Sequence, residues 1–353
     1  MKSLKKIKIG YIPNSSDLES PADKRRFVSY AKSRNINFEI ANIHKKYDLV
    51  ILSTLADIST WSKYDKGKVI YELLDSYLAI PKTNIKNKLR GVVGFLKGRY
   101  ANLQLNHTKA LINMCKKSDG VICSTEDQKK TISKYSKNVH IILDIHDSIT
   151  KNPKTNYESK KHFNLVWEGL PSNIHHLKFL SPILDKLNQN NSVKLNVITD
   201  RTQSKYFSFL GSVNIENKLK KISKHIVFHD FNFNSWSKIV RNSDLAIIPI
   251  DLLDPFASGK PENKLLLFWR MGLPVLTSPT LAYVSAQKKA GITKDLLCEN
   301  TDEWINNINK MIFDKELREK LGLQGKSFVE KFHSEELVYK KWDKLFNQLG
   351  FKI

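Results

Sequence analysis

The sequence has few cysteines and no long apolar run. Its 353 residues include three cysteines, Cys115, Cys123 and Cys298, and their spacing offers no zinc-ligand pair. An odd and small number argues against a disulfide framework and favours a reducing compartment. No window reaches the ~18 uninterrupted apolar residues of a membrane span, and residues 1–13 hold no apolar segment of signal-peptide length. We therefore expect a soluble, cytoplasmic protein without a metal site.

Acidic residues are also scarce. The chain has 35 Asp and Glu against 58 Lys and Arg, a formal net charge of +23 that is spread along its length. Such a field attracts polyanions, which include nucleic acids, anionic lipid head groups and nucleotide phosphates. Because no helix-turn-helix, zinc module or aromatic RNA-binding motif is present, a nucleic acid is not the favoured partner. A basic nucleic-acid-binding protein is kept as an alternative.

Apolar runs alternate with amphipathic segments along both halves of the chain, without hairpin signals in the first half. This alternation predicts α/β domains with parallel sheets and helices on both faces. The predicted strands are 5–13, 37–41, 47–54, 68–74, 119–124, 139–143, 163–167, 193–199, 225–228, 244–250 and 275–277. The predicted helices are 22–34, one long or two broken helices in 85–117, 125–134, 173–188, 235–241, the helix that opens near Pro261, 301–312, 314–332 and 334–348.

The length suits two domains rather than one. Residues 148–161 are polar, contain Pro153 and lack apolar periodicity, so they form the best linker candidate. We therefore predict a first Rossmann-like domain at 1–150, a linker at 151–161 and a second Rossmann-like domain at 162–333. The remaining residues, 334–353, are predicted to form a closing helix.

The most informative stretch is 243–278, which is predicted to fold as strand, loop, helix and strand. In open α/β sheets, ligands bind beyond the carboxyl ends of the strands, where this loop lies. Lys260 and Lys264 flank the start of the helix, with Pro261 in its first turn, and free backbone N–H groups at such a helix start suit a phosphate. The alternative is an ordinary surface loop before a core helix.

Five segments in this order resemble glycosyltransferases of the GT-B fold, the nucleotide-sugar-dependent kind that build bacterial surface polysaccharides. The segments are SDGVICSTEDQKKTISKYSKNVHIILDIHD, VWEGLPSNIHHL, HDFNFNSWSKIVRNSDLAIIPI, GKPENKLLLFWRMGLPVLTSP and LREKLGLQGKSFVEKFHSEELVYKKWDKLF. The resemblance implies two Rossmann-like domains facing a central cleft, with the last helix packing back on the first domain. It implies a nucleotide-diphosphate sugar as substrate, no tightly bound cofactor and no metal.

By resemblance, the donor site lies in the second domain. Its candidate residues are Gly169, Asn173, Asp200, Pro249, Ser258, Gly259, Lys260, Pro261, Glu262, Asn263 and Lys264. Many retaining members carry two glutamates that would fall at positions 259 and 267, where this chain has Gly259 and Leu267. Retention and inversion therefore both stay open.

The candidate catalytic residues are two carboxylates, Asp75 and Glu262. Asp75 directly follows an apolar strand, where burial raises the pKa of a carboxyl toward the range of a general base. Its alternative role is a capping residue after a strand. Glu262 could also bind ribose or sugar hydroxyls, or serve only to stabilise a helix dipole. The candidate acceptor side lies at strand ends of the first domain and comprises Asn14, Ser15, Ser16 and Asp57.

We interpret the chain as a glycosyltransferase that moves a sugar from a nucleotide-sugar donor to a glycan or lipid-linked acceptor. The nearest enzymatic alternative is a nucleotide-sugar epimerase on the same fold, which would turn over the donor without an acceptor. Basic residues in 86–99 fit electrostatic docking to the anionic inner face of a membrane, so a peripheral location is an expectation. A solvated basic face is the alternative.

Overall fold

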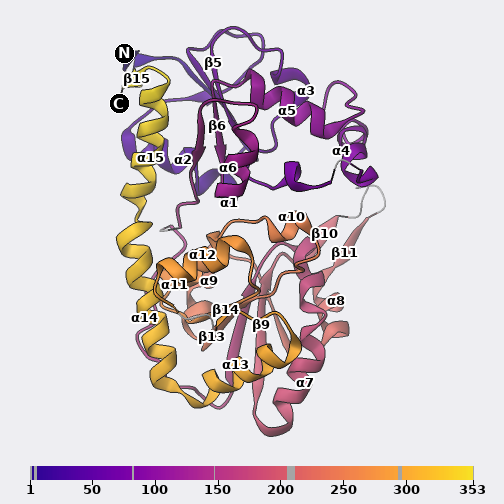
Figure 1. Cartoon of the computed structure of the whole chain (residues 1–353), viewed down its shortest axis with the longest axis vertical. Coiled ribbons are helices and arrows are strands. Elements are labelled where there is room, and N and C mark those ends of the chain that lie inside the picture. The colour runs from indigo at the N-terminus through magenta and orange to yellow at the C-terminus, as the bar shows by residue number, and fades with distance from the viewer. Residues whose placement is uncertain are drawn as a thin grey trace. The chain divides into compact units, whose positions relative to one another are not determined.

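The computed structural model describes residues 2–3, 6–81, 83–146, 148–204, 211–292 and 296–352, with the backbone alone at residues 86, 88 and 204. Its contacts divide the chain into two compact units (Figure 1). Unit 1 comprises Met1–Ile145, Pro255–Pro261 and Glu335–Ile353, and unit 2 comprises His146–Asp254 and Glu262–Ser334. These units are defined by contacts alone, so the domain limits drawn from the sequence stay a prediction.

A six-stranded parallel sheet forms the centre of unit 1. Its strands run in the order β3-β2-β4-β5-β6-β7, and every pairing is parallel. The order reverses between β2 and β4, and in such sheets ligands bind beyond the carboxyl ends at that point. The strands are β2 (Ile9–Ile12), β3 (Glu39–Ile40), β4 (Leu49–Leu52), β5 (Lys68–Glu72), β6 (Gly120–Cys123) and β7 (Val139–Ile141).

Helices cover both faces of this sheet. Leu49 and Ile51 of β4 enter a core with α2 and α15, whereas Val50 and Leu52 enter a second core with α3, α5 and α6. Successive side chains of β4 therefore point to opposite faces of the sheet, as expected for a strand that is buried on both faces. The helices of unit 1 are α1 (Pro21–Lys24), α2 (Phe27–Arg34), α3 (Ile58–Trp61), α4 (Ile85–Leu96), α5 (His107–Lys117), α6 (Glu126–Ile132), α10 (Pro255–Ser258) and α15 (Glu335–Gln348), with a 3₁₀ turn η2 (Tyr77–Ala79).

The helix α15 packs on the first core of unit 1 through aromatic rings. The ring of Trp342 stacks on that of Tyr30 in α2, with 5.5 Å between centroids. The hydroxyl of Tyr30 donates to Asp343 at 2.9 Å, so the same ring is fixed at its polar end. A short parallel pair, β1 (Lys2–Ser3) and β15 (Phe351–Lys352), closes this side of the unit.

A buried arginine joins the ends of two strands in unit 1. Arg26, at the start of α2, donates through Nε to Glu72 at 2.7 Å and through Nη1 to Asp144 at 2.9 Å. Its Nη2 donates to the carbonyl of Ile142 at 3.1 Å. Glu72 ends β5 and is fully buried. Burial raises the pKa of Glu72, and the guanidinium of Arg26 opposes that rise.

We predict that Arg26→Met destabilises the protein by about 3–5 kcal/mol, because Glu72 is left buried without its counter-charge. Urea unfolding should measure the loss. Since the pKa of Glu72 is already raised and rises further in the variant, protonation favours the folded state, and the deficit should shrink as the pH falls from neutral toward acid.

The matched control is Arg34→Met, which removes a guanidinium that pairs with Glu336 and Asp343 while partly exposed. That change should cost about 1 kcal/mol or less. Equal losses in the two variants would contradict the assigned role of Arg26.

Unit 2 has a five-stranded parallel sheet of order β12-β9-β8-β13-β14. The order reverses between β8 and β13, which marks the expected ligand edge of this sheet. The strands are β8 (Phe163–Glu168), β9 (Val193–Thr199), β12 (Ile226–Asp230), β13 (Leu245–Ile248) and β14 (Val275–Thr277), with an antiparallel pair β10 (Thr202–Ser204) and β11 (Ser212–Asn214). The helices are η3 (Pro171–Leu177), α7 (Leu180–Asn190), α8 (Ile215–Ile222), α9 (Phe233–Arg241), α11 (Asn263–Arg270), α12 (Leu281–Lys289), α13 (Thr301–Phe313) and α14 (Lys315–Phe332).

The predicted α/β class with parallel sheets is confirmed in both units. The helical region predicted at 85–117 is two helices, α4 and α5, and Gly98 ends the first of them with a left-handed φ of +71°. The helix predicted at 173–188 is the 3₁₀ turn η3 followed by α7. The helix predicted at 22–34 is divided into α1 and α2. The sequence interpretation missed several elements without a strong apolar run, which include α3, α8, α10, α12 and the pair β10–β11.

Candidate functional site

The carboxyl edge of the second sheet brings a lysine of α11 against the end of β8. Lys264, in the first turn of α11, donates to the carbonyl of Glu168 at 2.5 Å. Its ammonium lies over the ring of Trp167, 5.0 Å from the centroid. The positive charge is therefore held at the point where the strand order reverses, which is where an anionic ligand is expected.

Gly169 permits this approach because it has no side chain. A Cβ at position 169 would lie 2.5 Å from Cη2 of Trp167 and 2.7 Å from Nζ of Lys264. Trp167 is only 2% exposed, so its ring has little room to shift. Gly169, Trp167 and Lys264 are therefore tightly packed against one another. Gly169 is one of the predicted donor residues.

The helix that follows the loop begins later than predicted. The sequence placed Pro261 in its first turn, but α11 begins at Asn263 with Glu262 as the N-cap, and the Glu262 side chain makes no cap bond. The helix interior is buried as expected, from Leu265 to Trp269. Burial raises the pKa of Tyr283, and the negative charge of Glu262 raises it further.

The other predicted donor residues of unit 2 surround the same edge. Asn173 lies in η3, and its backbone N–H donates to the carbonyl of Leu170 at 2.9 Å. Pro249 directly follows β13, and Asp200 directly follows β9. Burial raises the pKa of Asp200, with further contributions from the negative charges of Asp230 and Glu168. These three residues therefore lie at strand or turn ends where a ligand could meet them.

Sequence reasoning did not assign His176 to this edge. Nδ1 of His176 accepts a hydrogen bond from the backbone N–H of Asp251 at 3.3 Å, and the side chain is 5% exposed. The contact joins η3, after β8, to the loop after β13. The two residues are 75 positions apart in the sequence, so no local pattern could reveal the pairing.

The predicted residues Ser258, Gly259, Lys260 and Pro261 lie in the segment whose contacts belong to unit 1. The hydroxyl of Ser76 donates to the carbonyl of Gly259 at 2.5 Å, and a Cβ at position 259 would lie 2.5 Å from that hydroxyl oxygen. Ser76 directly follows Asp75. This segment therefore meets the chain beside the candidate base.

Three cationic side chains of unit 1 act electrostatically on Asp75. Burial raises the pKa of Asp75, whereas the positive charges of Lys260, Arg90 and Arg99 lower it, in that order. The guanidinium of Arg90 lies 5.1 Å from the ring centroid of Tyr77 and 5.5 Å from that of Phe256. Nζ of Lys260 lies 5.4 Å from the same Phe256 ring. Arg90, Arg99 and Phe256 were not among the predicted site residues.

The predicted acceptor residues Asn14 and Ser15 are held by a buried carboxylate. Asp23 is fully buried and accepts from the backbone N–H of Asn14 at 2.8 Å and of Ser15 at 3.0 Å. The hydroxyl of Thr54 donates to Oδ1 of Asn14 at 3.2 Å. Asn14 follows β2 and Thr54 follows β4, so the contact lies where the strand order of the first sheet reverses. Ser16, next in sequence, is exposed.

Asp57 has a structural function in its own loop. Its carboxylate accepts from the hydroxyl of Ser59 at 2.5 Å, the hydroxyl of Thr60 at 2.6 Å and the backbone N–H of Ala101 at 3.0 Å. It is also the N-cap of α3. Burial would raise the pKa of Asp57, but these hydrogen bonds outweigh it and lower the pKa. Its role toward an acceptor stays a prediction.

The site residues thus form two groups, one in each unit. Asn14, Ser15, Asp57 and Asp75 with the segment 258–261 lie in unit 1. Gly169, Asn173, Asp200, Pro249, Glu262, Asn263 and Lys264 lie in unit 2. Within the described residues, no three His, Cys, Asp or Glu side chains gather as metal ligands. The described helices include none that is long and apolar enough to cross a bilayer.

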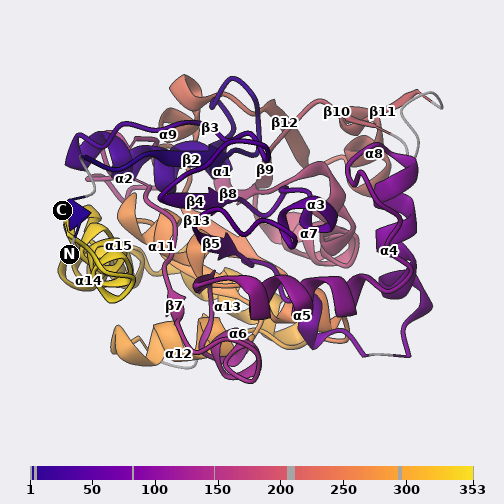
Figure 2. The ribbon, with the colours of Figure 1, turned by 90° about the horizontal axis from the view of Figure 1, so that it is seen from above.

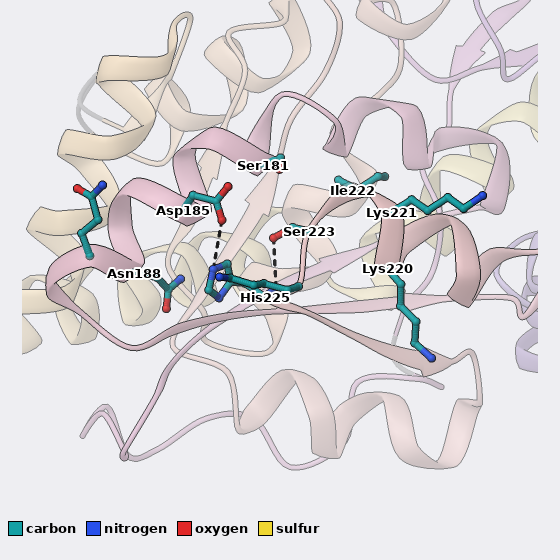
Figure 3. A pocket seen from close by; sticks show the side chains of 10 residues that line it. Ser181, Asp185, Asn188, Lys220, Lys221, Ile222, Ser223 and His225 are labelled. Carbon is teal, nitrogen blue, oxygen red and sulfur yellow. Dashed lines mark hydrogen bonds and ion pairs between the residues drawn. The ribbon is translucent and has the colours of Figure 1, made fainter.

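An open cavity of about 580 Å³ lies between α7 and α8 of unit 2 (Figure 3). Its wall includes Asp185, Lys220 and His225, and Nε2 of His225 lies 3.3 Å from Oδ1 of Asp185. His225 directly precedes β12, so this end of the cavity lies at the amino end of that strand. None of the predicted site residues lines it, and we assign it no part in donor binding.

Comparison with known proteins identifies the fold. No protein-family model and no curated protein matches the chain. The solved structure of Alr3699/HepE from Anabaena with UDP and glucose has a TM-score of 0.64 and 11% identity, and the match covers 97% of this chain and 99% of that one. WaaG, a glycosyltransferase involved in lipopolysaccharide biosynthesis, has a TM-score of 0.54 and 14% identity, with coverage of 95% and 85%.

A third structure, TarM, has a TM-score of 0.58 and 13% identity over 85% of this chain. The match covers 54% of TarM, so this chain spans about half of that protein's length. The chain has the GT-B fold of these glycosyltransferases, which confirms the fold expected from the sequence resemblance.

We predict that Gly169→Ala destabilises the protein by about 1–3 kcal/mol, because the added methyl meets the ring of Trp167. The change Trp167→Phe removes the ring atoms that the methyl would meet. The double variant should therefore lose less than the sum of the two single losses, by about 0.5 kcal/mol or more. Urea unfolding of all four proteins completes the cycle, and strict additivity would contradict the tight packing of Gly169.

Proposed function

We propose that the protein is a glycosyltransferase that binds a nucleotide-diphosphate sugar at the carboxyl edge of the second sheet and transfers the sugar to a glycan or lipid-linked acceptor. The observation that carries the proposal is Lys264, held between the end of β8 and the ring of Trp167 at the reversal point of a GT-B sheet. An anionic membrane surface is the proposed location, because the chain carries a net charge of +23.

The departing nucleoside diphosphate needs a positive charge close by. The ammonium of Lys264 can supply it, because it lies beside the carbonyl of Glu168 at the carboxyl end of β8, and an ammonium makes strong charge-assisted hydrogen bonds to phosphate oxygens. The start of α11, at Asn263, adds its partial positive charge. We assign to Glu262, the N-cap, the role of accepting hydrogen bonds from hydroxyls of the ribose or the sugar. These residues together bind and orient the donor.

The acceptor hydroxyl needs a base. We assign that function to Asp75, whose carboxylate takes the hydroxyl proton as the acceptor oxygen bonds to the anomeric carbon and the bond to the diphosphate breaks. Burial keeps the pKa of Asp75 above the usual range, which brings its basicity closer to the working pH. Asn14 and Ser15, held by Asp23, lie at the reversal point of the first sheet, which is the side we assign to the acceptor.

Donor binding is tested by thermal shift with nucleoside diphosphates and their sugars. We expect at least one nucleotide sugar to raise the melting temperature. Lys264→Met should weaken its binding by about tenfold to a hundredfold, which corresponds to the loss of a charge-assisted hydrogen bond worth about 1.5–3 kcal/mol.

The matched control is Lys238→Met, which removes an exposed lysine of α9 and should leave the shift unchanged. If no nucleotide or nucleotide sugar shifts the melting temperature, the donor site is refuted. If the donor turns over without any acceptor, an epimerase is the better assignment.

The pH dependence of transfer tests the assignment of Asp75. The acid limb of kcat/KM should report its raised pKa, because activity requires the deprotonated carboxylate. Arg90→Gln removes a positive charge that lowers this pKa, so the acid limb should move to higher pH. Lys109→Gln on the neighbouring helix α5 is the control and should leave the limb in place.

Asp75→Asn should lower kcat/KM by about 10²–10⁴-fold while the thermal shift with the donor persists. An Arg90→Gln profile that coincides with the wild-type profile would contradict the assignment. A variant Asp75→Asn that keeps full activity would refute it directly.

A further inference from the structure

The helix α4 has its apolar side chains turned outward. Ile85, Leu89 and Leu96 are 69%, 48% and 65% exposed, and they recur at the spacing of one helix face. Val92 completes the stripe at the same spacing and is half-buried. In Figures 1 and 2, α4 lies at the periphery of unit 1. An amphipathic helix of a globular protein normally turns its apolar face to the core. The apolar face of α4 is turned to solvent instead.

The inward face of α4 is small and polar. Asn87 is 2% exposed and donates to the hydroxyl of Thr108 at 3.0 Å. A Cβ at Gly91 would lie 2.2 Å from the carbonyl oxygen of Gln104, and one at Gly94 would lie 2.5 Å from the ring of Tyr100. These contacts fix which side of the helix faces the unit. The apolar stripe is therefore turned outward by close packing on the opposite side.

The loop after α4 extends the apolar surface. Leu103 and Leu105 are 49% and 74% exposed, and Phe95 in the last turn of α4 is 40% exposed. Single exposed apolar residues are common on soluble proteins, but a helical stripe with three further large side chains close in sequence is a candidate contact surface. We call Ile85, Leu89, Phe95, Leu96, Leu103 and Leu105 the apolar face.

The charges around the apolar face have one sign. Residues 76–118 contain no Asp or Glu and nine Lys and Arg. Arg90, Lys97 and Arg99 are exposed on or just after α4. A partner must therefore present both negative charge and a surface that accepts aliphatic side chains. Nucleic acid offers the first property and lacks the second. A second copy would bring an equally basic surface into contact, which like-charge repulsion opposes.

We propose that α4 docks in the plane of an anionic lipid bilayer, with the apolar face inserted among the lipids and the flanking cations on the head groups. Helices with an aliphatic face flanked by Lys and Arg bind bilayers in this way. The proposal goes beyond electrostatic attraction of a basic chain, because it names an inserted element. It also connects docking to the candidate acceptor site, since Arg90 of α4 lies against Tyr77 and acts on Asp75.

The test is flotation of the full chain with vesicles of phosphatidylcholine alone or mixed with phosphatidylglycerol. We expect binding to the mixed vesicles that falls with added salt. The triple variant Ile85→Ser, Leu89→Ser and Leu96→Ser should bind at least about tenfold more weakly, because the inserted apolar area is lost. The control triple Leu281→Ser, Phe313→Ser and Leu323→Ser removes apolar residues of similar exposure, 72%, 77% and 47%, and should bind as the wild type does.

Insertion itself is measured by the emission of a polarity-sensitive fluorescent dye attached to a cysteine. The three native cysteines are buried, so Leu96→Cys can be labelled selectively. Its emission should shift to the blue on mixed vesicles, whereas a label at Leu281→Cys should not shift. Unaltered binding of the first triple variant, or an unshifted label at position 96, would overturn the proposal. The proposal would also be overturned if the wild-type protein does not bind vesicles and forms dimers that the triple variant does not form.

These readouts need neither donor nor acceptor. A protein that docks without transferring sugar would refute the proposed function and leave the docking intact. A protein that transfers sugar to a soluble acceptor without binding vesicles would refute the docking and leave the proposed function intact.

Discussion

The buried guanidinium of Arg26 is the constraint on which the first candidate site depends. It is the shared partner of Glu72, at the end of β5, and of Asp144, shortly after β7. A fully buried glutamate next to a second carboxylate would be costly without this cation. Asp75 follows Glu72 by three residues, so the same arrangement that stabilises the sheet edge fixes where the candidate base leaves the strand.

Two glycines set the shape of the candidate sites in a comparable way. Gly169 allows Lys264 and Trp167 to meet over the end of β8, and Gly259 allows the segment 258–261 to approach Ser76. A side chain at either position would occupy the space that the neighbouring polar group fills. The sequence resemblance to glycosyltransferases implies a glutamate at position 259 in many retaining members. Here the backbone carbonyl of Gly259 accepts the hydroxyl of Ser76 instead, so the chain uses this position for close contact rather than for a carboxylate.

The sequence predicted the features that local patterns determine. Runs such as Leu49–Leu52 are apolar at every position, which identifies strands buried on both faces, and the apolar helix 265–269 is buried as its composition requires. Gly169 and Lys264 are both among the donor residues that the sequence predicts. The pairing of Arg90 with Tyr77 and Phe256 joins segments far apart in the chain, so it could not be predicted. For Asp57 the local pattern is ambiguous, because a polar residue after a strand is typical of a capping residue and of a ligand-binding residue.

The reversed polarity of α4 shows why composition alone misjudges a helix. Its leucines and isoleucine have the spacing that normally identifies a core face, and Gly91 and Gly94 have the composition that normally weakens a helix. Contacts with Gln104 and Tyr100 make the glycines the inward side, and the apolar face is thereby left to solvent. The stretch without acids, 76–118, then has two consequences from one cause. Its exposed cations favour a negative surface, and one of them, Arg90, also lowers the pKa of Asp75, so we expect a mutation of Arg90 to affect both docking and the candidate base.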